Sequence, residues 1–167
     1  AHFVTVSGYL GLSGVEPFLA AGLGAFVLVR TSNPDSSAVQ SEKLATGPTV
    51  AEHMGSLVKT LGEKHRGSTG LSAVGAVVGA TQSREAGALR AIMPDQIFLI
   101  PGYGAQGGTA DDIRVMRRAA QPPEKSGVLV TASRSVIYAK ASEGQHWLDA
   151  VGQAAKSLAR EIRDVVG

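Results

Sequence analysis

The 167-residue chain has no cysteine, so it forms no disulfide and offers no thiolate to a metal. Aromatic residues make up only 5% of the sequence, whereas 44% of the residues are hydrophobic and 21 are glycine. This composition provides enough apolar surface for a folded core, and it favours helices packed closely on a sheet over an aromatic-rich β-sandwich. The lack of cysteine also agrees with a cytoplasmic protein.

The sequence also lacks a strong charge imbalance and a long apolar run. Its 16 basic and 14 acidic residues give a formal net charge of +2, which does not indicate a nucleic-acid partner. No apolar run approaches the roughly 20 residues that a membrane span needs. The four histidines show no metal-ligand spacing. We therefore expect no nucleic-acid partner, no membrane attachment and no metal site.

Five short apolar runs predict the strands of the protein. Their apolar character is nearly continuous, which is typical of parallel strands covered on both faces. The predicted strands are His2–Ser7, Ala25–Arg30, Ala73–Thr81, Gln96–Gly102 and Gly127–Ser133.

Helical patterns lie between these runs and after the last one. Apolar residues recur at helical spacing from Val50 to Leu61 and from Leu148 to Val165. Capping boxes, in which a side chain at the helix start and one three residues later each bind the other's N–H group, also predict helix starts. The three pairs are Ser13 with Glu16, Thr49 with Glu52, and Thr109 with Asp112.

The alternation of strand and helix predicts a single α/β domain, residues 1–167, with a parallel sheet. Two architectures compete at this point: an open doubly wound sheet and a (β/α)8 barrel. A complete barrel takes about 250 residues, or roughly 30 for each β/α unit. The five units of this chain have that spacing, but three units of a barrel would be absent.

A glycine-rich segment, "PGYGAQGG", follows the fourth predicted strand. Gly102, Gly104 and Gly107 have the spacing of a dinucleotide-binding fingerprint, but the next strand ends in "VTASRS" without the acidic residue that this fingerprint needs. Glycines also let a loop bring its N–H groups close to an anion, and Arg134 after the next strand has a fork of donors suited to phosphate. The two loops together predict a phosphate site. The alternative is a tight turn beside a surface arginine.

These motifs in this order also resemble a known family. "PGYGAQGG" followed by "ASRSVIYA", with "VVGAT" before it and "TSNP" earlier, resembles orotidine 5′-monophosphate decarboxylase over essentially the whole chain. The "YLG" and "TSNPDSSAVQ" segments are similar to the longer bacterial branch of that family. The resemblance implies a (β/α)8 TIM barrel that converts orotidine 5′-monophosphate to uridine 5′-monophosphate (UMP) in pyrimidine biosynthesis. It further implies a homodimer that uses neither a metal nor an organic cofactor.

The resemblance assigns the phosphate-binding residues first. Gln106 matches the family glutamine that contacts both phosphate and base in the loop after the seventh strand. Arg134 matches the phosphate-binding arginine after the eighth strand, and the backbone of Ser133 lies beside it in the sequence.

The resemblance also implies three residues around the base. Ser32, in "TSNP", matches the serine that recognises the pyrimidine edge. Pro101 and Tyr103 would form a wall of the base pocket, although many relatives have a small apolar residue in place of Tyr103.

The catalytic residues of the family are missing from this sequence. The family places a lysine after its second strand and an Asp-x-Lys-x-x-Asp motif after its third. These groups press an aspartate against the substrate carboxylate and place a lysine to protonate C6. No Asp of this chain precedes a Lys by two positions. The first predicted strand would correspond to the family's fourth.

We therefore expect the chain, which begins without Met inside an apolar run, to be the C-terminal part of a barrel that lacks its first three β/α units. Alone, such a chain should be inactive unless the missing segment is supplied. Its two open sheet edges would pair with the missing N-terminal segment of the same protein or with another copy. A non-catalytic phosphate- or nucleotide-binding module and another sugar-phosphate barrel enzyme are the alternatives.

Overall fold

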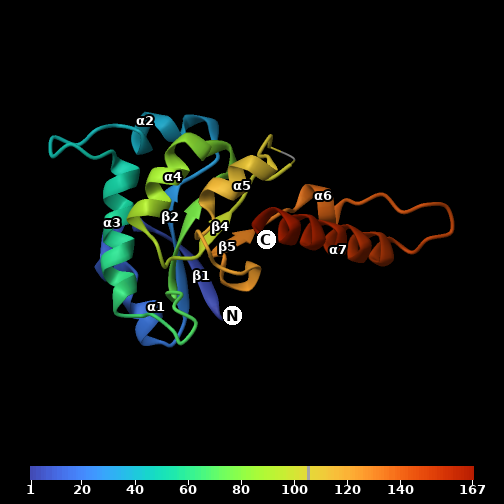
Figure 1. Ribbon diagram of the computed structural model, residues 1–167, viewed down its shortest axis with the longest axis horizontal. Helices are drawn as coiled ribbons and strands as arrows, with labels where there is room; N and C mark the ends of the chain where they lie inside the picture. Colours follow the sequence, from blue (N-terminus) through green and yellow to red (C-terminus); the bar gives the residue numbers. More distant parts are fainter. Residues whose placement is uncertain (105) are drawn as a thin grey trace.

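The computed structural model describes residues 1–104 and 106–167, and a five-stranded sheet forms its centre (Figure 1). The strands are β1 (Phe3–Ser7), β2 (Gly24–Arg30), β3 (Val74–Val78), β4 (Phe98–Ile100) and β5 (Val128–Val130). They confirm the five predicted strands: β2 begins one residue earlier than predicted, and the others are shorter by up to three residues at an end. All neighbouring strands are parallel, and the order across the sheet is β1-β2-β3-β4-β5.

This strand order decides between the two architectures that the sequence leaves open. A doubly wound sheet has a point at which the strand order reverses, and its ligands bind there. Each strand of this sheet instead lies beside the strand that precedes it in the chain, which is the arrangement of consecutive units in a (β/α)8 barrel. The chain is therefore an α/β protein with five consecutive barrel-type units.

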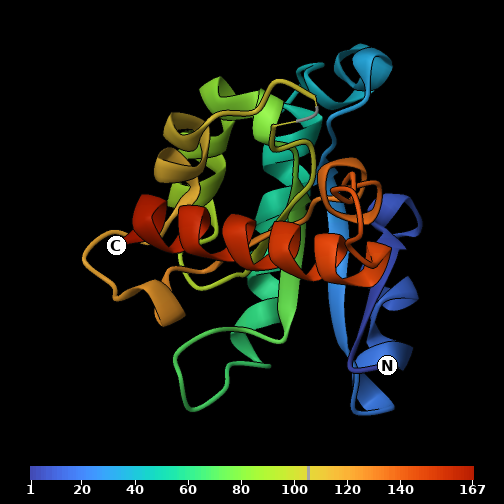
Figure 2. The ribbon, with the colours of Figure 1, turned by 90° about the vertical axis from the view of Figure 1, so that its right-hand side faces the viewer.

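Helices flank the sheet on opposite sides. Helices α3 and α4 lie on one side of the molecule, whereas α7 lies on the other side and runs crosswise to the strands (Figures 1 and 2). The α-helices are α1 (Glu16–Ala20), α2 (Ser37–Gln40), α3 (Val50–Glu63), α4 (Ser83–Ile92), α5 (Ala110–Met116), α6 (Arg134–Ile137) and α7 (Trp147–Val166). Short 3-10 turns cover Gly8–Leu10, Leu12–Gly14, Pro34–Ser36, Ala80–Gln82 and Pro123–Lys125.

Two of the three predicted capping boxes are present. The Thr49 side chain accepts a hydrogen bond from Glu52 N at 3.2 Å, and Glu52 Oε2 accepts one from Thr49 N at 2.7 Å, so both donors at the start of α3 are satisfied. Thr109 and Asp112 form the same reciprocal pair at the start of α5.

The third predicted capping box is wrong. Ser13 lies inside the 3-10 turn Leu12–Gly14, and α1 begins after it, at Glu16, with no side-chain cap. The 3-10 turn occupies the residues that the predicted helix start would need, and Val15 follows it as the N-cap of α1.

The core lies between the sheet and α3, α4 and α5. Val27, Ala76 and Phe98 are in register on β2, β3 and β4, and all three are fully buried. Gly55 lets α3 approach α4 closely, since a Cβ at this position would lie 3.2 Å from Met93 Cε.

The opposite face of the sheet is also apolar, but it is only partly covered. Leu28, Val77, Leu99 and Leu129 are in register across β2 to β5. The exposed fraction is 37% for Leu28 and 49% for Leu129, and it is 40% for Phe3 on β1. A parallel sheet is normally buried on both faces, so this second face needs a further layer.

Arg90, on α4, ties the N-terminal ends of β4 and β5 to two helices. Its guanidinium is buried, and four backbone carbonyls accept its hydrogen bonds at 2.7–3.0 Å. These carbonyls belong to Met93, Gln96, Met116 and Gly127. The guanidinium also lies 3.6 Å from the centre of the Phe98 ring, a cation–π contact. Burial lowers the pKa of Arg90 to about 9, which leaves the side chain charged at neutral pH.

We expect Arg90→Met to lower the free energy of unfolding by about 3 kcal/mol, because four buried carbonyls would lose their donor. Urea denaturation followed by circular dichroism measures the change. Arg84→Met is the matched control, since Arg84 is exposed on the same helix and its loss should change stability by no more than about 0.5 kcal/mol. Equal effects of the two variants would contradict a structural role for Arg90.

Candidate functional site

The predicted site residues follow the C-terminal ends of β2, β4 and β5. In a parallel sheet these ends lie along one edge, where loops from successive strands meet. Gly79 N donates to Arg30 O at 2.7 Å, and Ala80 N donates to Pro101 O at 2.9 Å, so the loop after β3 is bonded to the loops on both sides. The segment around α2 and the glycine loop lie at the same end of the molecule (Figure 2).

Ser32 and Gln106 come together at this end, although they are far apart in the sequence. A Cβ added at Gly102 would lie 2.8 Å from Gln106 Oε1 and 3.5 Å from Ser32 Cβ, so both side chains border the same glycine. The backbone of Ser32 packs equally closely on Gly79, where an added Cβ would lie 2.9 Å from Ser32 N. Glycine at 79 and 102 therefore leaves room for Ser32 beside both positions and for the Gln106 side chain beside Gly102.

The glycine loop is held by hydrogen bonds of its own. Gly102, Gly104 and Gly107 all have positive φ angles, of 93°, 66° and 93°, which other residues rarely adopt. Gly107 N donates to Gly104 O at 2.9 Å, and Gly104 N donates to Gly108 O at 2.9 Å. Gly108 N donates to Gly102 O at 3.2 Å. These three N–H groups are used within the turn, whereas the side chain of Gln106 is exposed.

Tyr103 lies on the other side of this loop, against α7. Its ring is 8% exposed, and its hydroxyl donates a hydrogen bond to Glu161 Oε1. Burial, together with this hydrogen bond, raises the pKa of Tyr103 to about 12, so the phenol is neutral at physiological pH. Tyr103 thus anchors the loop to the C-terminal helix. Pro101, half-buried at the end of β4, contributes its carbonyl to the link with Ala80.

Ser133 and Arg134 lie at the start of α6, in the loop after β5. Both are exposed, and Arg134 forms no ion pair with any residue in the described ranges 1–104 and 106–167. The loops after β4 and β5 adjoin, because a cavity of about 350 Å³ is lined by Tyr103 and Gly104 on one side and by Ser135 on the other. The structure gives no direct contact between Arg134 and Gln106.

Sequence reasoning missed two charged residues at this end of the sheet. Arg30 ends β2 and is 1% exposed, and it forms an ion pair with Glu85 on α4, with Nε 2.6 Å from Oε2. The sequence signal that could have indicated Arg30 is a charged residue at the end of an otherwise apolar strand. Nothing in the sequence pairs Arg30 with Glu85, since the two lie on different β/α units.

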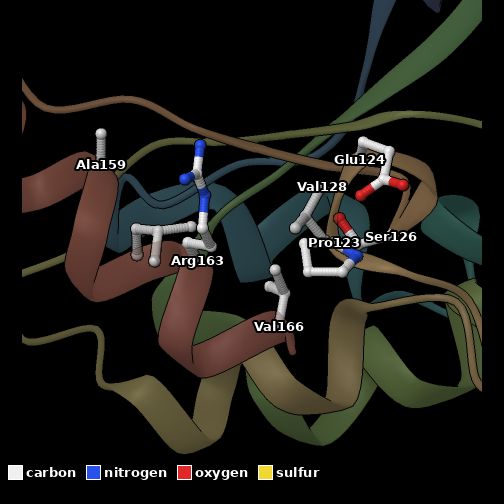
Figure 3. A pocket seen from close by; sticks show the side chains of 8 residues that line it. Pro123, Glu124, Ser126, Val128, Ala159, Arg163 and Val166 are labelled. Carbon is white, nitrogen blue, oxygen red and sulfur yellow. The ribbon is translucent and has the colours of Figure 1, made fainter.

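A separate cavity of about 430 Å³ lies near the N-terminal end of β5, between this strand and the end of α7 (Figure 3). Glu124 and Arg163 line it together with apolar side chains, and none of the predicted site residues reaches it. A third cavity, of about 500 Å³, continues along β5 and is mainly apolar. A groove therefore follows the whole length of this edge strand.

Among the residues that the structure describes, no three His, Asp or Glu side chains gather in a way that could hold a metal ion. In the same residues, no helix is sufficiently long and apolar to cross a membrane.

Comparison with known proteins identifies the family. The family model described as "Orotidine 5'-phosphate decarboxylase / HUMPS family" matches residues 1–146. The chain is 41% identical over 167 residues to the orotidine 5′-phosphate decarboxylase of Bordetella avium, and it covers 99% of its own length but 57% of that relative. It is 37% identical to the decarboxylase of Rhodopirellula baltica, of which it covers 55%.

The fold agrees with these relatives. The structure of Leishmania donovani OMP decarboxylase matches with a TM-score of 0.74 and 27% identity, over 99% of this chain and 57% of that one. The chain thus spans little more than half the length of the proteins it resembles. The resemblance predicted from the glycine loop and its neighbouring motifs is confirmed at the level of the family: the chain belongs to the orotidine 5′-phosphate decarboxylase / HUMPS family.

Proposed function

We propose that this chain provides the phosphate- and base-binding part of an orotidine 5′-monophosphate decarboxylase. The observation that carries the proposal is the meeting of Ser32 and Gln106 beside Gly102, at the C-terminal end of a parallel sheet. In barrel enzymes this end holds the active site, and phosphate commonly binds to the loops after the last two strands. Those loops carry Gln106 and Arg134 in this chain.

The roles follow from the chemistry of each side chain. The Ser32 hydroxyl can both donate and accept a hydrogen bond, which suits the edge of a pyrimidine. The Gln106 amide can bridge base and phosphate, since it carries an NH2 donor and a carbonyl acceptor. Arg134 supplies a permanent positive charge with a planar fork of donors for the phosphate. Ser133 places its backbone beside that charge, and no metal or organic cofactor is needed for these contacts.

We further propose that a segment with three more β/α units completes the barrel and supplies the catalytic lysine and aspartates. Three features support this. The second face of the sheet exposes Leu28 and Leu129, β5 is an edge strand with a groove along it, and the chain spans 57% of its relative from B. avium. Three units of a barrel take roughly 100 residues. The complete protein would act as a cytoplasmic homodimer in pyrimidine biosynthesis.

A second function is a nucleotide- or phosphate-binding module without catalysis. It is favoured by one observation, namely that the sequence contains no Asp-x-Lys pair. The two functions differ in what happens when the barrel is completed, because only the decarboxylase then releases CO2. A sugar-phosphate enzyme of the same barrel type would instead show no preference for a pyrimidine.

We expect the 167-residue chain to bind UMP but to release no CO2 from orotidine 5′-monophosphate. Arg134→Ala should weaken UMP binding by about 10- to 100-fold, because charge-assisted hydrogen bonds to the phosphate would be lost. Isothermal titration calorimetry measures the affinity. Arg163→Ala is the matched control, since it removes the same exposed charge near the other end of β5. CO2 release by the chain alone would contradict the proposal.

Ser32→Ala should lower the affinity for UMP by about 3- to 10-fold, the loss expected for one neutral hydrogen bond. The affinity for ribose 5-phosphate, which has no base, should stay the same. The same titrations with both ligands measure this difference. If both affinities fall equally, Ser32 does not recognise the base, and the sugar-phosphate alternative gains support.

We expect decarboxylation when the missing β/α units are joined to this chain. A chimera would place the N-terminal segment of the B. avium decarboxylase, up to its match with Ala1, before this chain. We expect the folded chimera to release CO2 from orotidine 5′-monophosphate, which neither part should do alone, and Arg134→Ala in the chimera should lower kcat/KM. A chimera that folds by circular dichroism and binds UMP without turnover would instead favour the binding module.

A further inference from the structure

Arg30 is a buried cation at the end of the sheet that forms the candidate site. Its guanidinium binds the Glu85 carboxylate through two donors, with Nε 2.6 Å from Oε2 and Nη2 3.3 Å from Oε1. Glu85 lies in the first turn of α4, the helix that follows β3. The pair therefore connects the end of β2 to the next β/α unit.

The remaining donors of Arg30 point to the loop that follows β2. Nη1 donates to Ser36 Oγ at 2.6 Å and to Gln40 Oε1 at 3.3 Å, and Nη2 donates to Ser37 Oγ at 3.0 Å. Gln40 in turn closes the loop, because its Oε1 accepts from Thr31 N at 2.9 Å and its Nε2 donates to Thr31 Oγ1 at 3.0 Å. Residues 31–40 thus form a closed loop, here called the ring, whose side chains surround the Arg30 guanidinium.

Ser32 lies within this ring, directly after Thr31. Its backbone is held against Gly79, and its side chain borders Gly102 together with Gln106. A change in the ring would therefore move the Ser32 hydroxyl relative to Gln106. Arg30 itself lies beneath the loop and is too deeply buried to contact a ligand directly.

A contribution to stability alone does not explain a charge at this position. A buried ion pair generally stabilises a fold no more than well-packed apolar side chains of similar volume, whereas it can fix one arrangement of polar groups. Arg90 provides the contrast within the same chain. It is also buried, but backbone carbonyls accept its hydrogen bonds, and it lies near the N-terminal ends of the strands, away from the loops of the site.

We propose that Arg30 is a positioning residue for base recognition: it holds residues 31–40 so that Ser32 faces the ligand beside Gln106. The inference rests on the proposed function, because it assumes that Ser32 recognises the pyrimidine. In this view, the preference for a ligand with a base depends on Arg30, although Arg30 does not contact the base. The phosphate end of the site, built from the loops after β4 and β5, is independent of Arg30.

The test compares UMP with ribose 5-phosphate by isothermal titration calorimetry on the 167-residue chain. Arg30→Lys keeps the positive charge but loses the fork of donors. We expect its affinity for UMP to fall by about tenfold, the effect of misplacing a hydrogen-bonding group, with the affinity for ribose 5-phosphate unchanged. The preference for the ligand with a base would then be lost.

Two further variants separate positioning from stability. Arg90→Lys should lower the melting temperature and leave the ratio of the two affinities as in the wild type. The double variant Ser36→Ala, Ser37→Ala removes two loop acceptors and retains the Arg30–Glu85 pair, so it should lose the base preference even if Arg30→Lys does not fold.

The outcomes are distinct. If the wild type prefers UMP and the folded Arg30 and serine variants keep the same preference, the positioning role is overturned while the proposed function stands. If Arg90→Lys reduces the preference as much as Arg30→Lys, loss of stability explains both and the role is again overturned. If the wild type binds neither ligand, the proposed function fails, and the positioning role fails with it.

Discussion

The sequential parallel order of the five strands is the constraint on which the rest of the structure depends. Because each strand lies beside its predecessor and points the same way, every loop that follows a strand emerges at one edge. Ser32, Gln106 and Arg134 reach that edge from three different units. No local feature of the sequence brings them together; only the topology of the sheet does. The same order leaves β1 and β5 as edges and leaves one apolar face partly exposed, so the arrangement that forms the site also makes the sheet incomplete.

The sequence predicted the strands and the longer helices well, because their signals are local. The apolar runs that became β1 to β5 and the reciprocal pair of Thr49 and Glu52 depend on residues within a few positions of one another. The capping box predicted at Ser13 is wrong, because its signal is as local as the one that correctly predicted the box at Thr49. A pattern of two residue types three positions apart fits a helix start, but it cannot show that a 3-10 turn already occupies Leu12–Gly14. Strand order, which excluded a doubly wound sheet, is a non-local property and came only from the structure.

The candidate site could be predicted only as a set of residues, without their orientations. The glycine loop was recognisable from its spacing, but the N–H groups of Gly104, Gly107 and Gly108 bond within the loop, and Tyr103 faces α7 through Glu161. Neither outcome follows from the sequence, because positive φ angles permit several turn geometries and a tyrosine ring can lie on either side of a loop. The roles of Ser32, Gln106 and Arg134 remain predictions. What the structure adds is that Ser32 and Gln106 border one glycine.

Two buried arginines show how one residue type serves different ends of the same sheet. Arg90 donates to four backbone carbonyls, in α5, after α4 and before β4 and β5, so it joins the ends of these elements. Arg30 donates to side chains of a polar loop and to a carboxylate on another unit, so it defines the shape of a segment that has little apolar packing of its own. Residues 31–40 are mostly polar and Val39 is exposed, so hydrophobic burial contributes little to their order, and a buried guanidinium with five donors is a physical means of ordering them. For that reason, the arrangement of residues 31–40, which include Ser32, depends on the buried charge of Arg30.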